Sequence, residues 1–219
     1  NLIICGRREE KLQKLQAELS NKVKVDYLVF DVRDRQLVHN VLAPALENQV
    51  IDVLVNNAGN AHGMAPIEGG SLDDWDAMID GNVKGLLYVT KEILPGMIEK
   101  KHGHIINIGS IAGKEVYPNG NVYCASKHAV DAINNGMRMD LNQYGIKVSQ
   151  ISPGLVETEF SEVRFKGDTD RAAKVYQDMK ALQAQDIAEI ASFMISRPQH
   201  VNLSDVIVLP NAQASSTMV

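Results

Sequence analysis

The segment HIINIGSIAG, residues 104–113, is the best place to begin inferring the fold. Its first six residues are a short run rich in isoleucine, which is typical of a β-strand covered on both faces. Residues 72–100 before it and residues 122–144 after it carry apolar side chains at helical spacing. A buried strand between two amphipathic helices is the repeating unit of a parallel α/β sheet.

The same alternation continues in both directions along the chain. Further short runs rich in Val and Ile are NLIIC (1–5), VKVDYLVF (23–30), IDVLVN (51–56), IKVSQIS (146–152) and DVIVLP (205–210). Helical spacing recurs over residues 8–19, 34–47 and 185–195. The sequence therefore predicts an α/β fold with a doubly wound, mostly parallel sheet. At 219 residues with 45% hydrophobic content, a single domain over residues 1–219 is sufficient.

Composition limits the classes of partner. The formal net charge is −5 and the pI is about 5.7, so no basic field favours nucleic acid or an acidic membrane. No apolar run approaches the roughly 20 residues of a membrane span. Cys5 and Cys124 lie far apart, without disulfide-framework or metal-ligand spacing. We expect a cytoplasmic protein that acts on a small molecule and holds no metal.

Ligands of such sheets bind in the crevice at the carboxyl ends of the strands, so the residues just after each strand matter most. GRRE (6–9) follows the first strand, where an arginine accommodates the 2′-phosphate of NADP. Arg7 and Arg8 therefore favour NADP as the cofactor. The alternative is a solvated arginine pair that opens a helix.

FDVRD follows the second strand and offers a second cofactor contact. Asp31 can accept a hydrogen bond from an adenine amino group while the backbone of Val32 donates one. Asp31 can equally cap the N-terminus of the next helix, and the sequence leaves both interpretations open.

NNAG, residues 56–59, follows the third strand. The small residues Ala58 and Gly59 allow backbone to approach a ligand closely. Asn56 and Asn57 can tie neighbouring loops together through their amides, or simply form turns. The four-residue string alone is only moderately specific for a cofactor site.

Ser110, Tyr123 and Lys127 form the candidate catalytic group. Tyr123 and Lys127 are four residues apart, so they share one helical face. A phenol has an ordinary pKa of about 10, and a neighbouring ammonium lowers that pKa and makes the phenol a usable acid or base. Ser110 follows the fourth strand and can hydrogen-bond a substrate oxygen. The alternative is a capping serine and an exposed Tyr/Lys pair.

The order of these motifs along the chain resembles the short-chain dehydrogenase/reductase family. The motifs are NNAG, Asn82 in GNVKG, Ser110 in GSIAG, Tyr123 and Lys127 in YCASK, and PG at 153–154. Their spacing matches over nearly the whole chain, and the joint pattern is highly specific.

The resemblance implies a Rossmann-type fold, a nicotinamide cofactor and the catalytic set Asn82, Ser110, Tyr123 and Lys127. In this family the tyrosine is the acid/base, the lysine also holds the nicotinamide ribose, and the asparagine supports a water-linked proton relay. The resemblance also implies homodimers or homotetramers packed through the helices that bear Asn82 and Tyr123. Residues expected near the nicotinamide carboxamide are Pro153, Gly154, Val156 and Thr158.

A narrower resemblance points to the NADP-dependent serine and 3-hydroxy acid dehydrogenases. It rests on LPGMIEKKHGHIINIGSIAG, GNVYCASK, EFSEVRFKGD and HVNLSDVIVLP. Members of that branch oxidise serine, allo-threonine or 3-hydroxyisobutyrate, whose carboxylates need a cation. Arg164 and Lys166 are available in the irregular stretch 153–171, which we expect to be a mobile lid, and Arg164 suits a bidentate grip. The alternative is a lid arginine that faces solvent.

One part of the family pattern is missing from residues 1–219. The glycine-rich TGxxxGxG loop and its strand do not occur, because residue 1 already opens the next strand. We expect the sequence to be the tail of a protein roughly 30 residues longer, the length of a strand, loop and helix.

Other functions and residues carry less weight. A reductase of another small carbonyl compound and a catalytically silent NADP-binding protein stay open, although a silent protein has no need for Ser110, Tyr123 and Lys127 together. Epimerases and dehydratases with the same pair usually carry a large extra domain, for which this chain has no room. Trp75 is interpreted as a packing residue. No role is assigned to His62, His102, His104, His128 and His200.

Overall fold

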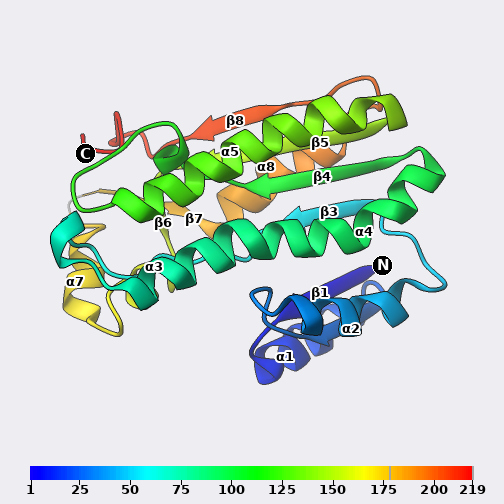
Figure 1. Ribbon diagram of the computed structural model, residues 1–219, viewed down its shortest axis with the longest axis horizontal. Coiled ribbons are helices and arrows are strands. Elements are labelled where there is room, and N and C mark those ends of the chain that lie inside the picture. The colour runs from blue at the N-terminus through cyan, green and yellow to red at the C-terminus, as the bar shows by residue number, and fades with distance from the viewer. Residues whose placement is uncertain (178, 219) are drawn as a thin grey trace.

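Residues 1–177 and 179–218 are described by a computed structural model, in which parallel strands alternate with helices (Figure 1). The strands are β1 (Leu2–Gly6), β2 (Val25–Val29), β3 (Val53–Asn56), β4 (Gly103–Ile108), β5 (Ile146–Pro153), β6 (Val156–Glu157), β7 (Leu182–Gln183) and β8 (Asp205–Val208). The α-helices are α1 (Glu9–Leu19), α2 (Arg35–Leu46), α3 (Leu72–Ile79), α4 (Leu86–Lys100), α5 (Asn121–Leu141), α6 (Phe160–Arg164), α7 (Thr169–Lys174) and α8 (Ala184–Ile195). The six predicted strands and the parallel α/β architecture are confirmed.

The strands form three parallel sheets among the described residues. β3, β4, β5 and β8 lie side by side in that order, β1 pairs with β2, and β6 pairs with β7. Figure 1 shows α4 and α5 side by side over one face of the four-stranded sheet, with α8 behind it. Met97 of α4 packs on Ile105 and Val148 on the front face. Met194 of α8 packs on Ile106 on the opposite face.

Burial of the strands follows their place in the ladders. β4 and β5 are buried almost throughout, as their apolar composition predicts. Leu2 in β1 and Val55 in β3 are 43% and 44% exposed, so these two strands are not covered on both faces. Each of them has a ladder partner on one side only among the described residues.

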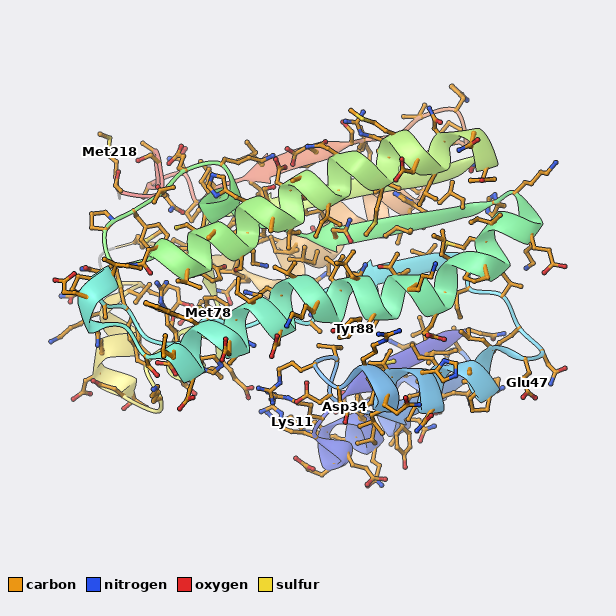
Figure 2. The ribbon with its side chains drawn as sticks, viewed as in Figure 1. Lys11, Asp34, Glu47, Met78, Tyr88 and Met218 are labelled. Atoms are coloured by element: carbon orange, nitrogen blue, oxygen red, sulfur yellow. The ribbon has the colours of Figure 1, made fainter. Side chains whose placement is uncertain are left out.

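α4 packs against both the four-stranded sheet and the β1–β2 unit. Figure 2 shows Tyr88 projecting from α4 toward the β1–β2 unit. There it packs against the buried cluster of Phe30, Val38 and Leu42. This contact holds the candidate cofactor residues after β1 and β2 next to the main sheet.

Residues 72–100 do not form the single helix that their spacing predicts. A π-helical turn, Asp80–Gly85, separates α3 from α4, and Asn82 lies in it. A π-turn widens the helix by one residue and is common at functional sites. Apolar spacing cannot reveal this turn, because it carries no information about the hydrogen bonds that the Asn82 side chain forms there.

The stretch 153–171 contains short elements that its irregular pattern does not predict. It includes β6, α6 and the start of α7. α6 and α7 have five and six residues, too few for a helical period to be read from sequence.

No helix among the described residues is both long and apolar enough to cross a membrane. The same residues contain no cluster of His, Cys, Asp or Glu suited to hold a metal. Both cysteines are free thiols.

Candidate active site

Ser110 and Tyr123 approach each other from two different elements. Ser110 lies just after β4, where its hydroxyl accepts a hydrogen bond from the Ala112 N–H at 3.1 Å and begins the 3₁₀ turn Ile111–Gly113. Tyr123 lies in the first turn of α5 and is 8% exposed. Burial raises the Tyr123 pKa above its ordinary value, while a hydrogen bond with Ser110 lowers it in part.

Lys127 lies one turn further along α5 and is also buried. Its Nζ donates a hydrogen bond to the Ile108 carbonyl at 3.0 Å, and burial lowers the Lys127 pKa to about 8. The groups that lower the Tyr123 pKa are Ser110 and Arg164, and Lys127 is not one of them. The expected lowering of the phenol pKa by Lys127 is therefore wrong for this structure, because desolvation dominates and the ammonium is directed at the end of β4.

Asn82 is held rigidly in the π-helical turn. Its side chain is 2% exposed, accepts a hydrogen bond from the Asn60 N–H at 2.7 Å and donates one to the Asn60 carbonyl at 2.8 Å. It also donates to Ser126 Oγ at 3.0 Å, and Ser126 Oγ donates to the Tyr123 carbonyl at 2.7 Å. The π-turn, the NNAG loop and α5 are thus tied together.

The NNAG loop forms one edge of the site. Asn57, Ala58 and Gly59 are exposed. A Cβ on Gly59 would lie 3.0 Å from Asn82 Oδ1 and 3.8 Å from Lys127 Nζ, so a side chain here would crowd both polar groups. Asn56 differs in role, because its amide donates to Thr90 Oγ1 and Asn107 Oδ1 at 3.0 and 2.9 Å and so ties β3 to α4 and β4.

Asp31 has a partner that the sequence did not predict. Its carboxylate accepts hydrogen bonds from Arg33 Nε and Nη2, the shortest at 2.7 Å, and lies 3.7 Å from Arg7. Burial alone would raise the Asp31 pKa, but the hydrogen bonds and charge of Arg33 outweigh it and lower the pKa. The N-cap of α2 is Asp34, which accepts from the Leu37 N–H at 2.9 Å. The interpretation of Asp31 as a helix cap is therefore wrong.

Arg7 and Arg8 have different surroundings. The Arg7 side chain forms a loose ion pair with Asp31 and is 64% exposed, so most of it remains accessible. Arg8 instead pairs with Glu159 at 2.8 Å, and Lys11 pairs with the same carboxylate. Hydrogen bonds from Lys11 and then Arg8 lower the Glu159 pKa to about 2. Val32 packs against the buried cluster of Phe30, Val38 and Leu42.

The PG segment leaves β5 at the same end of the sheet. Gly154 donates to the Val208 carbonyl at 2.8 Å, and the Val156 carbonyl accepts from the Tyr176 hydroxyl at 2.9 Å. Thr158 Oγ1 accepts from the Phe160 N–H at 3.2 Å and so begins α6. Pro153 is buried at the last position of β5.

A cavity of about 110 Å³ lies beside the phenol of Tyr123. The Arg164 guanidinium borders it, 5.5 Å from the ring centres of both Tyr117 and Tyr123. Arg164 Nε donates to the Gly63 carbonyl at 3.3 Å, whereas its Nη2 is buried without a hydrogen-bond partner among the described residues. Lys166, the other cation suggested for this segment, pairs with Asp74 at 2.9 Å.

A family model described as short chain dehydrogenase matches residues 1–169. The chain belongs to the short-chain dehydrogenase family. This membership accounts for the order of the motifs and for the convergence of Asn82, Ser110, Tyr123 and Lys127 at one end of the sheet.

Two curated members of the family are similar over almost the whole chain. The NADP-dependent 3-hydroxy acid dehydrogenase YdfG of Escherichia coli K12 is 47% identical over 216 residues, which are 97% of this chain and 86% of the relative. Sulfoacetaldehyde reductase 2 of Chromohalobacter salexigens is 43% identical over 99% of this chain and 86% of the relative. A solved structure, the closed form of a serine dehydrogenase complexed with NADP⁺, superposes with a TM-score of 0.92 at 44% identity, covering 99% of this chain and 88% of that one.

Several residues around this short-chain dehydrogenase site were not predicted from sequence. Trp75 packs with Met78 and Tyr123 and also lines the cavity, so its role extends beyond packing. Tyr117 stacks on Arg164 from a loop without periodicity. The signal that could have found both is their place in segments flanking the catalytic motifs, GSLDDW and KEVYPNG.

Proposed function

We propose that this short-chain dehydrogenase transfers a hydride between NADP(H) and the hydroxyl-bearing carbon of a small 3-hydroxy acid. Serine, allo-threonine and 3-hydroxyisobutyrate are the expected substrates. Two named relatives support this class, the 3-hydroxy acid dehydrogenase and the serine dehydrogenase. The observation that carries the proposal is the Arg164 guanidinium, which borders the cavity beside Tyr123 and has a buried Nη2 without a hydrogen-bond partner among the described residues.

The residues just after β1 and β3, which include Arg7 and Gly59, form the edge of the site that we propose to hold the cofactor (the cofactor edge). This edge fits NADP(H). Arg7 presents an exposed guanidinium suited to a 2′-phosphate, and Gly59 leaves the space beside Asn82 and Lys127 free of a side chain. Bound NADP(H) would supply the hydride, which no side chain can provide. The residues that we propose to hold it are Arg7, Arg8, Asp31, Val32, Asn57, Ala58, Gly59, Tyr123, Lys127, Pro153, Gly154, Val156 and Thr158.

Tyr123 is the proposed proton donor and acceptor. Burial keeps its phenol protonated at neutral pH, so in the direction of reduction it can give a proton to the carbonyl oxygen. The same contacts that lower its pKa, the Ser110 hydroxyl and the Arg164 charge, stabilise the phenolate that remains. Ser110 orients the reacting oxygen, because its hydroxyl lies beside the phenol.

Lys127 and Asn82 are the residues that we propose to return a proton to Tyr123 after it has given one to the substrate. Lys127 has a pKa of about 8 and can gain or lose a proton close to neutrality. Its Nζ and Asn82 Oδ1 both lie within 4 Å of the Cβ position of Gly59, and the Asn82 amide is fixed by Asn60 and Ser126. We propose that this pair connects the site to the proton pool of the solvent.

Arg164 is the proposed carboxylate partner. A guanidinium with one free, desolvated edge gains strongly from an anion, because charge-assisted hydrogen bonds are strong where water is excluded. The aromatic faces of Tyr117 and Tyr123 keep the guanidinium in place. We also propose that α6, which carries Arg164, belongs to a lid over residues 153–171 that closes on the substrate.

Substitution of Arg164 tests the substrate class. Loss of a charge-assisted contact worth about 1.5–3 kcal/mol should raise KM for L-serine about 10- to 100-fold. KM for a neutral alcohol of similar size should change less than about 2-fold. Arg171→Ala is the matched control, because Arg171 stacks on Phe165 from the same segment and lies outside the cavity. If Arg164→Ala raised KM equally for L-serine and for the alcohol, the proposed contact between Arg164 and the substrate carboxylate would be wrong.

A second candidate is a reductase of another small carbonyl compound that bears an anion. The similarity to sulfoacetaldehyde reductase 2 favours it, because a guanidinium binds sulfonates as well as carboxylates. Parallel assays with L-serine and sulfoacetaldehyde separate the two. Tight NADP⁺ binding without turnover of either compound would instead indicate a catalytically silent protein.

We further propose a cytoplasmic homodimer or homotetramer. Apolar side chains on the outer faces of α4 and α5 support it, including Leu87 and Met139, which are 41% and 71% exposed. Figure 1 shows these two helices side by side on one face of the molecule. The two free thiols suit a reducing compartment. Light scattering should give a multiple of the chain mass, and a monomer at all concentrations would contradict the proposed assembly.

A further inference from the structure

The loop that carries Ser110, residues 109–114, is held in place by unusually close contacts on both sides. A Cβ on Gly109 would lie 2.8 Å from the side chain of Gln150 in β5. A Cβ on Gly113 would lie 2.6 Å from the backbone carbonyl oxygen of Lys127 in α5. The loop is therefore pressed against both the sheet and the helix that bears Tyr123, so a small displacement at its end would be transmitted to Ser110.

The last residue of this loop, Lys114, is fixed by two carboxylates from different elements. Its Nζ pairs with Asp131 of α5 and with Asp205 of β8, the latter at 2.5 Å. Asp131 lies one helical turn after Lys127, on the same face of α5. The side chains are only 22%, 24% and 32% exposed for Lys114, Asp131 and Asp205.

Polar side chains of β5 complete the cluster. Gln150 Nε2 donates to Asp131 Oδ1 at 3.0 Å and to Ser152 Oγ at 2.9 Å, and Ser152 Oγ donates to Asp205 Oδ1 at 3.1 Å. Gln150 is the same residue that contacts Gly109. Hydrogen bonds and ion pairs thus join Lys114 at the end of the Ser110 loop to Gln150, which contacts Gly109 at the start of the loop.

Charge makes Lys114 the essential member of this cluster. It is one cation between two carboxylates, which would repel each other without it. Burial would lower the Lys114 pKa, but the hydrogen bonds and charges of Asp131 and Asp205 outweigh this effect and raise it. Lys114 is therefore charged in the folded protein and holds α5, β8 and the loop together.

We propose that Lys114, with Asp131 and Asp205, is a positioning group that sets Ser110 relative to Tyr123 and Lys127. None of these three residues belongs to the cavity beside Tyr123. They act through the loop and α5, which bring the serine hydroxyl to the phenol. The proposal rests on the proposed hydride-transfer function. It assigns these three residues an effect on the rate of hydride transfer and none on which substrate is bound.

The kinetic test uses K114M, with K114R as the conservative variant that keeps the charge. K114M should lower kcat about 10-fold or more, because misplacement of a catalytic group by about 1 Å is costly. KM for the hydroxy acid and the Kd for NADP⁺ should stay within about 2-fold, and K114R should recover most of kcat. K24M is the matched control, because Lys24 forms an exposed pair with Asp26 on β2. A kcat within about 2-fold of wild type in K114M would overturn the proposal, and so would a KM that rises as much as kcat falls.

Two further measurements keep the test decisive. D205N retains the Lys114–Asp131 pair, so it should lower kcat less than K114M and serves if K114M does not fold; a normal kcat in both D131N and D205N would also contradict the proposal. Crystal structures of wild type and K114M test positioning without any substrate. Ser110 Oγ should move away from the Tyr123 hydroxyl, and an unchanged position would overturn the proposal. A wild-type protein that turns over no hydroxy acid would instead refute the proposed function.

Discussion

The amide of Asn82 forms two hydrogen bonds to the backbone of one residue, Asn60, at 2.7 and 2.8 Å. The side chain is 2% exposed, so no water can replace these bonds. The pair joins the π-helical turn between α3 and α4 to the loop after β3. These two hydrogen bonds therefore help to keep the loop after β3 in position relative to α5, the helix that carries Tyr123.

Asn82→Ala should therefore destabilise the protein as well as reduce activity. It leaves the Asn60 N–H and carbonyl without partners, and each orphaned group costs about 1–3 kcal/mol. Urea denaturation should show this loss in the free energy of unfolding. Asn40→Ala is the control, because Asn40 forms one exposed hydrogen bond with Gln36. An Asn82→Ala protein as stable as the Asn40→Ala protein would show that the Asn60 contact contributes little.

Substitution by alanine should change the stability of the protein in opposite directions at Gly113 and at Gly136. A methyl group at Gly113 would meet the Lys127 carbonyl oxygen at 2.6 Å, and backbone cannot yield without moving the Ser110 loop. Gly113→Ala should cost about 1–3 kcal/mol of unfolding free energy and lower kcat. A methyl group at Gly136 in α5 would meet none of the described residues within 4 Å, so Gly136→Ala should stabilise by about 0.5–1 kcal/mol. Thermal denaturation of both variants checks these two predictions. If Tm shifted in the same direction in both, at least one of the predictions would be wrong.

His104 makes stability depend on pH. It is 4% exposed, its Nε2 lies 2.8 Å from Ser149 Oγ, and burial followed by the charge of Lys147 lowers its pKa from 6.5 to about 4. Between pH 6.5 and 4 the unfolded chain binds a proton at this residue and the folded chain does not, so stability falls as the pH falls through that window. The loss should approach about 3 kcal/mol near pH 4.

The comparison of wild type with His104→Asn isolates this effect from the titration of carboxylates. The asparagine does not titrate, so the free energy of unfolding of the variant should depend less steeply on pH between 6.5 and 4. Identical slopes for the two proteins would mean that His104 binds its proton equally in the folded and unfolded states, so that folding does not lower its pKa.

Arg7 should determine the preference for NADP over NAD. Its guanidinium is 64% exposed beside Asp31 and suits the 2′-phosphate that only NADP carries. Arg7→Ala should raise the Kd for NADP⁺ about 10-fold, a typical effect of one phosphate contact, and leave the Kd for NAD⁺ unchanged. Lys14→Ala, an exposed change on α1, should alter neither constant. Equal weakening of both cofactors by Arg7→Ala would assign Arg7 a structural role.

The fold was predictable because strands β4 and β5 are buried on both sides and leave continuous apolar runs in the sequence. The candidate site was predictable in outline because the family motifs stand directly after strands. The π-turn at Asn82 was not, since the Asn82 side chain there bonds to Asn60, a residue that lies 22 positions away in sequence. Short helices such as α6 also escaped prediction, because five residues show no period.

The protonation states could not be predicted from residue types. A Tyr/Lys pair four residues apart suggests a phenol with a lowered pKa, yet burial raises the Tyr123 pKa and lowers that of Lys127. Burial depends on the tertiary packing of Met78, Trp75 and Phe160 around the phenol, which no local pattern encodes. The ion pairs of Lys114 with Asp131 and Asp205 escaped prediction for the same reason.

The most direct test of the account is the rate of NADPH formation from NADP⁺ and L-serine by wild type and Tyr123→Phe. We predict steady turnover by the wild type and a loss of about 10²–10⁴-fold in kcat for the variant, the usual contribution of a general acid or base. The loss should appear in kcat far more than in NADP⁺ affinity, because Tyr123 is only one of the residues proposed to hold the cofactor, and the free energy of unfolding should change little. A Tyr123→Phe protein that keeps half of the wild-type rate would contradict the assignment of the proton to Tyr123.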